Sequence, residues 1–342
     1  MVRDLHIAEN TVGLTVMVSD PGSAFAKELP GQVERTLKEV LGEMINVHVN
    51  VDSAMIGLGS EIMAGQGKPA KHDFDRASVI AVASGKGGVG KSTVTVNLAV
   101  SLAKAGYAVG LVDTDIYGPS IPTMFGVTDA KPRVNSDRKI IPVEKAGVKL
   151  LSMGFLADPN QAVIWRGPMV SNAIRQFLGD ADWGDLDFLL LDLPPGTGDI
   201  QLTIVQTVAL TGAIIVSTPQ EVALADARRG VAMFQNVNVP VLGIVENMAY
   251  FTPPELPDKK YYIFGQGGAR NLAGELDVPF LGEVPIEQAL RESGDAGTPY
   301  VDGNQESAST AAFESLAQEA LTQTALYKAK LPAQDGIEIS YR

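Results

Sequence analysis

The chain has 342 residues, of which 45% are hydrophobic and 20% are charged. These proportions are ordinary for a globular protein, and the length suits about two domains. Acidic residues outnumber basic ones by 40 to 27, which gives a formal net charge of -13. Such a charge repels phosphate backbones and anionic lipid, so we expect no nucleic-acid partner and no membrane partner.

Cysteine is absent from the sequence. Disulfides, cysteine nucleophiles and thiolate ligation of zinc or iron–sulfur clusters by this chain's own residues are therefore excluded. The three histidines, His6, His48 and His72, are widely separated and predict no metal cluster. The first residues are too charged for a signal peptide, and no apolar stretch reaches the length of a membrane helix. We therefore expect a soluble, cytoplasmic protein.

Residues 1–56 predict a small, partial α/β domain. Alternating apolar residues over 12–18 and 47–51 predict two strands. Between them, apolar residues three and four apart from Val33 to Met44 predict a helix.

Glycine, proline and charged residues concentrate at 57–77, which predicts a linker. From residue 78 to 342, continuous apolar runs alternate with helical patterns. The predicted strands are 79–83, 107–113, 187–192, 213–217, 241–246 and 279–284. The predicted helices lie near 91–105, 168–178, 200–209, 222–236, 267–276 and 307–327. This pattern predicts an α/β domain with a mostly parallel sheet covered by helices on both faces.

A phosphate-binding loop follows the first strand of this larger domain. The sequence Gly85-Lys-Gly-Gly-Val-Gly-Lys-Ser-Thr93 satisfies G-x-x-x-x-G-K-[ST] between a strand and a helix. That context disfavours the alternative of a chance glycine-rich turn. The residues predicted to contact the nucleotide are Gly85, Lys86, Gly87, Gly88, Val89, Gly90, Lys91, Ser92 and Thr93. In such loops backbone N–H groups surround the phosphates, the lysine reaches the β- and γ-phosphates, and the serine hydroxyl ligates Mg²⁺. The sequence thus predicts a P-loop NTPase.

Three aspartates follow predicted strands of the same domain. Asp113 and Asp115, which would point the same way on a continuing strand, are assigned to the water shell of Mg²⁺ and to positioning the attacking water. Asp192 ends a run of four apolar residues, as the Walker B carboxylate does, and is assigned to Mg²⁺ through water. Gly196 could bring an N–H to the γ-phosphate within a switch segment, 193–199. The alternatives are a polar strand exit for the first pair and a simple Pro-Pro-Gly turn for the last segment.

Longer motifs carry a resemblance to a known family. In chain order they are DTDIYGPSIPTMFG (113–126), IWRGPMVS (164–171), LLLDLPPGTGD (189–199), STPQEVALADARRG (217–230), ENMAYF (246–251) and IFGQGG (263–268). Over most of residues 78–300 the chain resembles the Mrp/ApbC family of iron–sulfur cluster carrier ATPases, within the ParA/MinD-like class whose phosphate loop reads KGGVGK.

The resemblance implies an ATP-dependent homodimer that delivers clusters to apo iron–sulfur proteins or works with assembly factors. Lys86, Lys91 and Asp115 would be catalytic, with Lys86 crossing to the phosphates of the partner subunit. Asn247 would contact the adenine ring; from the residues alone, capping a turn at the end of a strand is the alternative.

The chain departs from this family at its cluster ligands. Pro253 and Leu256 stand where many members have the two cysteines of C-P-x-C, and Ser23 stands at the usual cysteine of the N-terminal domain. The opening helix of that domain is also missing. Three interpretations remain open: a partner's cysteines hold the cluster, the chain keeps only an ATP-driven assembly or chaperone role, or ligands were removed by engineering.

Two other functions compete with cluster delivery. A positioning ATPase like ParA or MinD needs a basic surface or a basic amphipathic C-terminal helix, and residues 321–332 offer little of either. An ATP-gated scaffold would bind ATP without turning it over, but would not need all three aspartates.

Overall fold

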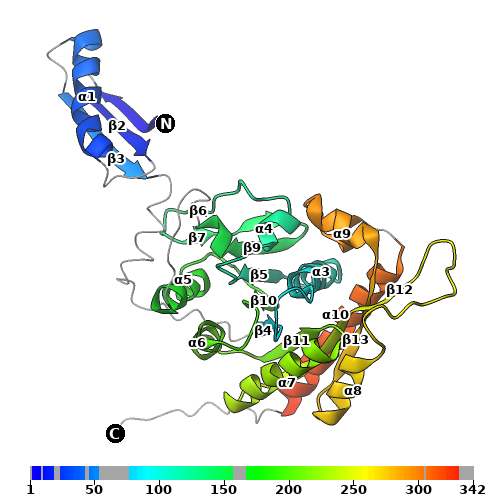
Figure 1. Ribbon diagram of the computed structural model, residues 1–342. Helices are drawn as coiled ribbons and strands as arrows, with labels where there is room; N and C mark the ends of the chain where they lie inside the picture. The colour runs from blue at the N-terminus through cyan, green and yellow to red at the C-terminus, as the bar shows by residue number, and fades with distance from the viewer. Residues whose placement is uncertain are drawn as a thin grey trace, which may run out of the picture. The chain divides into compact units, whose positions relative to one another are not determined.

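The computed structural model describes residues 2–8, 11–18, 24–42, 46–53, 77–156, 167–303 and 306–330. The chain divides into two compact units, Met1–Lys68 and Pro69–Arg342 (Figure 1). Nearly all of the predicted linker and the first residues of the motif at 164–171 lie outside the described residues.

The small unit consists of three strands and one helix. They are β1 (Val2–Ala8), β2 (Thr11–Val18), α1 (Ala24–Leu41) and β3 (Asn46–Ser53). β2 is the central strand, antiparallel to β1 and parallel to β3. Val12 and Leu14 are buried, as the alternation in β2 requires if one face of the sheet is covered. Both predicted strands and the helix are present, whereas β1 was not predicted because charged residues interrupt its short apolar pattern.

The large unit contains an eight-stranded sheet. Its strands are β4 (Ser78–Ala83), β5 (Val109–Asp113), β8 (Val143–Lys145), β9 (Val148–Ser152), β10 (Phe188–Asp192), β11 (Gly212–Ser217), β12 (Val241–Phe251) and β13 (Phe280–Ile286). The order is β13-β12-β11-β4-β10-β5-β9-β8, and only β8 runs antiparallel to its neighbour. All six predicted strands are present. The pair β8–β9 at the edge was not predicted, because its two runs are short and carry charges.

Helices cover both faces of this sheet. They are α3 (Lys91–Lys104), α4 (Ile121–Met124), α5 (Gly167–Gly179), α6 (Asp199–Thr207), α7 (Glu221–Asn236), α8 (Gly268–Glu275), α9 (Gln288–Asp295) and α10 (Ala308–Lys330). α3 and α10 pack together on one face, and α5, α6, α7 and α8 line the other (Figure 1). The prediction of a mostly parallel sheet with helices on both faces is confirmed. Among the described helices, none combines the length and apolar character that crossing a bilayer demands.

Strand register brings the site residues together. Asp192 at the end of β10 is aligned with Val82 of β4 on one side and with Asp113 of β5 on the other. These three central strands are fully buried, so their continuous apolar runs fix the register of the polar residues that follow. The phosphate loop, which leaves β4, therefore lies at the same edge of the sheet as both aspartates.

Candidate nucleotide-binding site

The loop between β4 and α3 forms an open cradle. Gly88 and Gly90 adopt left-handed backbone angles, with φ of 83° and 78°. A Cβ at Gly90 would lie 2.2 Å from Asn247 Nδ2, so that position has no room for a side chain. The loop borders a cavity of about 210 Å³, and of the predicted contact residues 87–93 line it. Because side chains do not fill this cavity, backbone N–H groups of the loop are available to an anion.

The first two predicted contact residues lie differently. A Cβ on Gly85 would lie 2.2 Å from the carbonyl carbon of Asp226, so the start of the loop packs directly on the backbone of α7. Lys86 is half-buried. Within the described part of the chain its ammonium has no hydrogen bond or ion pair. Neither residue lines the cavity, so neither faces a nucleotide bound in this subunit as the structure stands.

Lys91, Ser92 and Asp192 form a buried cluster beside the cradle. Lys91 Nζ lies 2.7 Å from Asp192 Oδ2, and both side chains are almost completely buried. The Ser92 hydroxyl donates to the same carboxylate oxygen at 2.7 Å. Thr95, one turn further along α3, donates to the other oxygen, Oδ1, at 2.6 Å. Both carboxylate oxygens of Asp192 are thus held in place by α3.

Asp113 lies in register with Asp192 and, like Asp192, is fully buried. Its oxygens accept hydrogen bonds from the Ser152 hydroxyl (2.9 Å) and from the backbone N–H groups of Asp115 and Ile121. Burial, reinforced by the nearby carboxylate of Asp192, raises the pKa of Asp113 to about 7. Burial and the neighbouring charge of Asp192 therefore both favour the protonated form of the Asp113 carboxyl group.

Asp115 lies outside the sheet, on the wall of the cavity. β5 ends at Asp113, so the expectation that a continuing strand would point both aspartates the same way is wrong. Asp115 Oδ1 accepts N–H groups of Tyr117 and Gly118 at 3.2 Å, an Asx-type turn that holds the carboxylate at the cavity. It faces the volume where phosphates would lie, whereas Asp113 does not.

Gly196 contacts the phosphate loop itself. Its N–H donates to the carbonyl of Ser84 at 2.9 Å, and its φ is 102°. The preceding residue, Pro195, lines the 210 Å³ cavity. The N–H predicted to reach a γ-phosphate is therefore engaged by the loop, and would have to leave Ser84 to make that contact.

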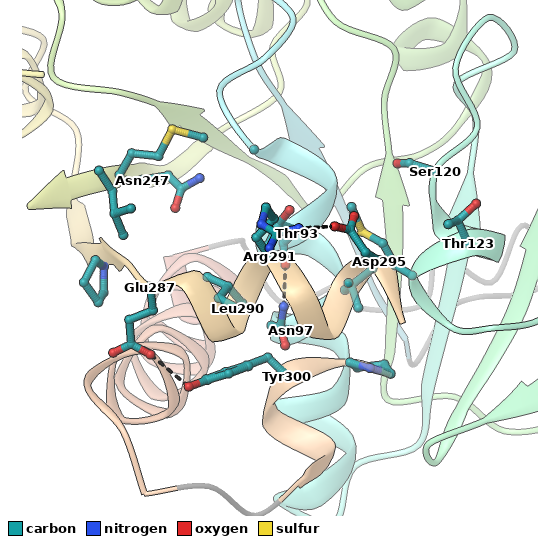
Figure 2. Close-up of a pocket in the computed structure, with 18 of the residues that line it drawn as sticks. Thr93, Asn97, Ser120, Thr123, Asn247, Glu287, Leu290, Arg291, Asp295 and Tyr300 are labelled. Carbon is teal, nitrogen blue, oxygen red and sulfur yellow. Dashed lines mark hydrogen bonds and ion pairs between the residues drawn. The ribbon is translucent and has the colours of Figure 1, made fainter. Parts of the chain in front are cut away.

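A larger cavity of about 850 Å³ continues from the cradle. Thr93 and Ser120 line both cavities. Asn247 lies on one side and Ser120 on the other, with α9 and its residues Leu290 and Arg291 forming a wall (Figure 2). A mostly apolar pocket of this size with a few polar groups suits a nucleoside-sized ligand.

The amide of Asn247 connects β12 to the phosphate loop. Its Nδ2 donates to the carbonyl of Val89 at 2.8 Å, and the side chain is buried. Asn247 lines the larger cavity and also holds the phosphate loop, whereas its predicted contact with an adenine ring stays a prediction.

Two hydroxyl groups that hold the aspartates were missed by the sequence analysis. Thr95 follows Lys91 by one helical turn, a spacing that the phosphate-loop motif does not include. Ser152 ends β9, the strand next to the edge strand β8, and β9 was not predicted. A signal existed only for Thr95, as a polar residue on the same helix face as Lys91.

A strand–loop–helix cradle with a lysine, a serine and a carboxylate from an adjacent parallel strand defines a P-loop NTPase. The family model described as NUBPL iron-transfer P-loop NTPase matches residues 75–321, and the chain belongs to this family. The resemblance to iron–sulfur cluster carrier ATPases is confirmed, and the protein is a P-loop ATPase.

Similar proteins agree with this assignment. The iron-sulfur cluster carrier protein of Synechocystis is 48% identical over 324 residues, 93% of this chain and 89% of that protein. An Arabidopsis thaliana iron-sulfur protein required for NADH dehydrogenase is 52% identical over 70% of this chain and 76% of its own length. A nucleotide-binding protein from Archaeoglobus fulgidus, solved in complex with ADP, is 41% identical with a TM-score of 0.61, over 72% of this chain and 93% of that one.

Proposed function

We propose that this chain acts as a Mg²⁺-dependent, ATP-hydrolysing homodimer that promotes transfer of iron–sulfur clusters to apo-proteins. The observation that carries the proposal is the convergence of Lys91 and Ser92 on one carboxylate oxygen of Asp192, beside an open phosphate cradle. The triphosphate would lie in the cradle and the nucleoside in the 850 Å³ cavity, past Thr93 and towards Asn247. Asp115, on the cavity wall, would position the attacking water.

The donor set beside the cradle fits Mg²⁺. The Ser92 hydroxyl and Asp192 Oδ2 are 2.7 Å apart, and hydroxyl and carboxylate oxygens are the ligands Mg²⁺ prefers. The ion would neutralise the β- and γ-phosphates. Lys91 shares that carboxylate oxygen, so we expect its ammonium to turn to the phosphates when Mg²⁺ and ATP bind. Asp113 has three protein donors and is suited to the outer water shell rather than to direct ligation.

The surroundings of Lys86 support a homodimer. Its ammonium has no partner among the described residues, although the loop around it is tightly packed at Gly85. A lysine that does not line its own cavity is suited to reach a nucleotide in a second copy of the chain.

The cluster is cargo, and this chain supplies no thiolate for it. Phe251 and Tyr261 pair across a loop that carries Pro253 and Leu256 at the family's cysteine positions. The described residues also contain no group of three His, Asp or Glu side chains arranged to hold a metal. We infer that cysteines of another protein hold the cluster while ATP binding and hydrolysis in this chain control its transfer.

Two experiments test the proposal. For the dimer, ATPase rates are measured for Lys86→Ala, for Asp115→Ala and for an equimolar mixture. If Lys86 acts across the interface, each variant alone is inactive, but a mixed dimer has one site with its own Asp115 and an intact lysine from its partner. Recovery in the mixture is expected; no recovery would place Lys86 in its own site.

For cluster transfer, a cysteine-bearing scaffold loaded with cluster under anaerobic conditions is mixed with an apo iron–sulfur protein. Transfer is followed by absorbance with ATP and either the wild type or Lys91→Ala. Faster transfer with the wild type alone is expected. Equal rates with both proteins would contradict a transfer role, and a stable cluster on the isolated chain would contradict ligation by another protein.

A further inference from the structure

Two of the three histidines, distant in the sequence, lie in register across the small sheet. His6 of β1 is aligned with Gly13 of β2, and Gly13 is aligned with His48 of β3. Aligned residues of neighbouring strands project from the same face of a sheet. The adjacent positions Val12 and Leu14 are buried and point to the opposite face. The two imidazoles therefore stand on the exposed face with a glycine between them, and both are exposed.

Neither backbone angle nor packing requires a glycine at position 13. Gly13 is not among the residues with positive φ. A Cβ built there would meet only the carbonyl oxygen of His6, at 4.0 Å. Glycine weakens the interior of a strand and often marks a place that a ligand approaches closely. Here its effect is to leave the space between His6 and His48 free of any side chain.

The spacing suits two imidazoles bound to one ion. Two strand separations place the Cα atoms of His6 and His48 about 10 Å apart. Two side chains inclined towards each other, joined through metal–nitrogen bonds of about 2.0–2.1 Å, can span this separation. Within the described residues neither imidazole has a hydrogen bond or an ion pair, and His48 interacts with Glu34 of α1 only through longer-range electrostatics. No contact of this kind holds either ring in a fixed orientation.

We propose that His6 and His48 together bind one divalent first-row transition-metal ion above Gly13. Neutral imidazole is a good ligand for zinc, copper, nickel and iron, and water would complete the coordination shell. The site lies in the small unit, outside the residues that match the family model, and it does not depend on the proposed function.

Zinc binding to the full chain tests this proposal. Nucleotide-free protein, stripped with a chelator, is titrated with Zn²⁺ by calorimetry in excess Mg²⁺, which occupies oxygen sites rather than imidazoles. We expect one Zn²⁺ per chain. His6→Gln and His48→Gln should each weaken binding at least about tenfold, as even the loss of a residue that only supports a metal ligand does.

Two further variants control for the fold and for other ligands. His72→Gln removes the remaining histidine and should leave the affinity unchanged. Gly13→Val keeps both imidazoles, suits a strand, and should weaken binding by filling the space between them. Circular dichroism checks that each variant is folded. The proposal would be overturned if His6→Gln, His48→Gln or Gly13→Val bound Zn²⁺ as tightly as the wild type.

Discussion

Lys91 Nζ lies 2.7 Å from Asp192 Oδ2, and with side-chain exposures of 6% and 0% the pair is withdrawn from water. The lysine begins α3 and the aspartate ends β10, so the ion pair connects the phosphate loop to the centre of the sheet. A buried pair of this kind adds little net stability, but the loss of one partner leaves the other charge without compensation.

We therefore predict that the single variant of this pair is less stable than the double variant. Lys91→Met should lower the free energy of unfolding by about 3–5 kcal/mol, because it leaves Asp192 as an unpaired buried charge. Lys91→Met/Asp192→Asn should recover most of that loss, yet both variants should lack ATPase activity. Urea unfolding and a phosphate-release assay measure the two effects, with Lys145→Met, at an exposed position, as the control. A double variant no more stable than Lys91→Met would contradict this account.

Thr95 is predicted to be a positioning residue for Asp192. Its hydroxyl is fully buried and holds the carboxylate oxygen that Ser92 and Lys91 do not contact. Thr95→Val should lower kcat about tenfold, on the scale of other residues that orient a metal's ligands, and raise the Mg²⁺ concentration required. Thr95→Ser should restore both.

Thr324→Val provides the matched control for Thr95. Thr324 is another buried threonine whose hydroxyl donates within a helix, in α10. Its loss should change stability without changing the Mg²⁺ dependence. The role assigned to Thr95 is contradicted if Thr95→Val and Thr324→Val have the same kinetics as the wild type.

Gly90 and Asn247 are predicted to be coupled. Gly88→Ala and Gly90→Ala both place alanine in a left-handed conformation, at a cost of about 1–2 kcal/mol. Only Gly90→Ala also displaces the Asn247 amide from Val89, so it should reduce ATP affinity well below that of Gly88→Ala. Adding Asn247→Ala to Gly90→Ala should recover part of the lost stability, which a double-mutant cycle of unfolding free energies measures. Additive effects would exclude the coupling.

The sequence could predict the features that depend on local patterns. Continuous apolar runs gave the six main strands, and the glycine spacing before Lys91 gave the phosphate loop with its strand and helix. The position of Asp192 was predictable because a charged residue that directly follows a buried apolar run marks the carboxyl end of that strand. Each of these conclusions needed no more than a short window of sequence.

The remaining features depend on register between distant segments. The hydrogen bond from Ser152 to Asp113 exists because β9 pairs with β5. The bond from Asn247 to Val89 exists because β12 passes beside the phosphate loop. The alignment of His6 with His48 through Gly13 has the same origin. No periodicity in the sequence encodes such pairings.

Glu246 is predicted to make stability depend on pH. It is buried beside Asn247 and accepts a hydrogen bond from the N–H of Ala269 at the start of α8. Burial raises the pKa of Glu246 above its usual value, an effect only partly opposed by that hydrogen bond. The folded state therefore binds this proton more tightly than the unfolded state. The resulting stability is present below the ordinary pKa of a glutamate and is lost as the pH rises through the raised value.

Glu246→Gln should remove this contribution while keeping an acceptor for Ala269. The variant should therefore gain stability relative to the wild type as the pH rises from about 4, near the usual pKa of a glutamate, towards neutrality. Urea unfolding at several pH values measures the difference, and Glu255→Gln, at an exposed position, serves as the control. A constant difference between wild type and Glu246→Gln across this range would contradict the prediction.

Gly126 and Gly297 are predicted to join two walls of the larger cavity. Gly126 follows α4 and Gly297 follows α9, and both have positive φ, of 64° and 73°. A Cβ on Gly126 would lie 2.8 Å from the carbonyl oxygen of Gly297, which leaves no room for alanine. Gly126→Ala should force α4 and α9 apart at a cost of about 1–3 kcal/mol and weaken ATP binding. Gly106→Ala isolates the backbone cost, since Gly106 has a φ of 94° and nothing within 4 Å of its added Cβ. Unfolding and nucleotide-binding measurements should separate the two variants, because only Gly126→Ala should lose affinity for ATP as well as stability. Equal ATP affinities in the two variants would show that the contact between Gly126 and Gly297 does not shape the cavity.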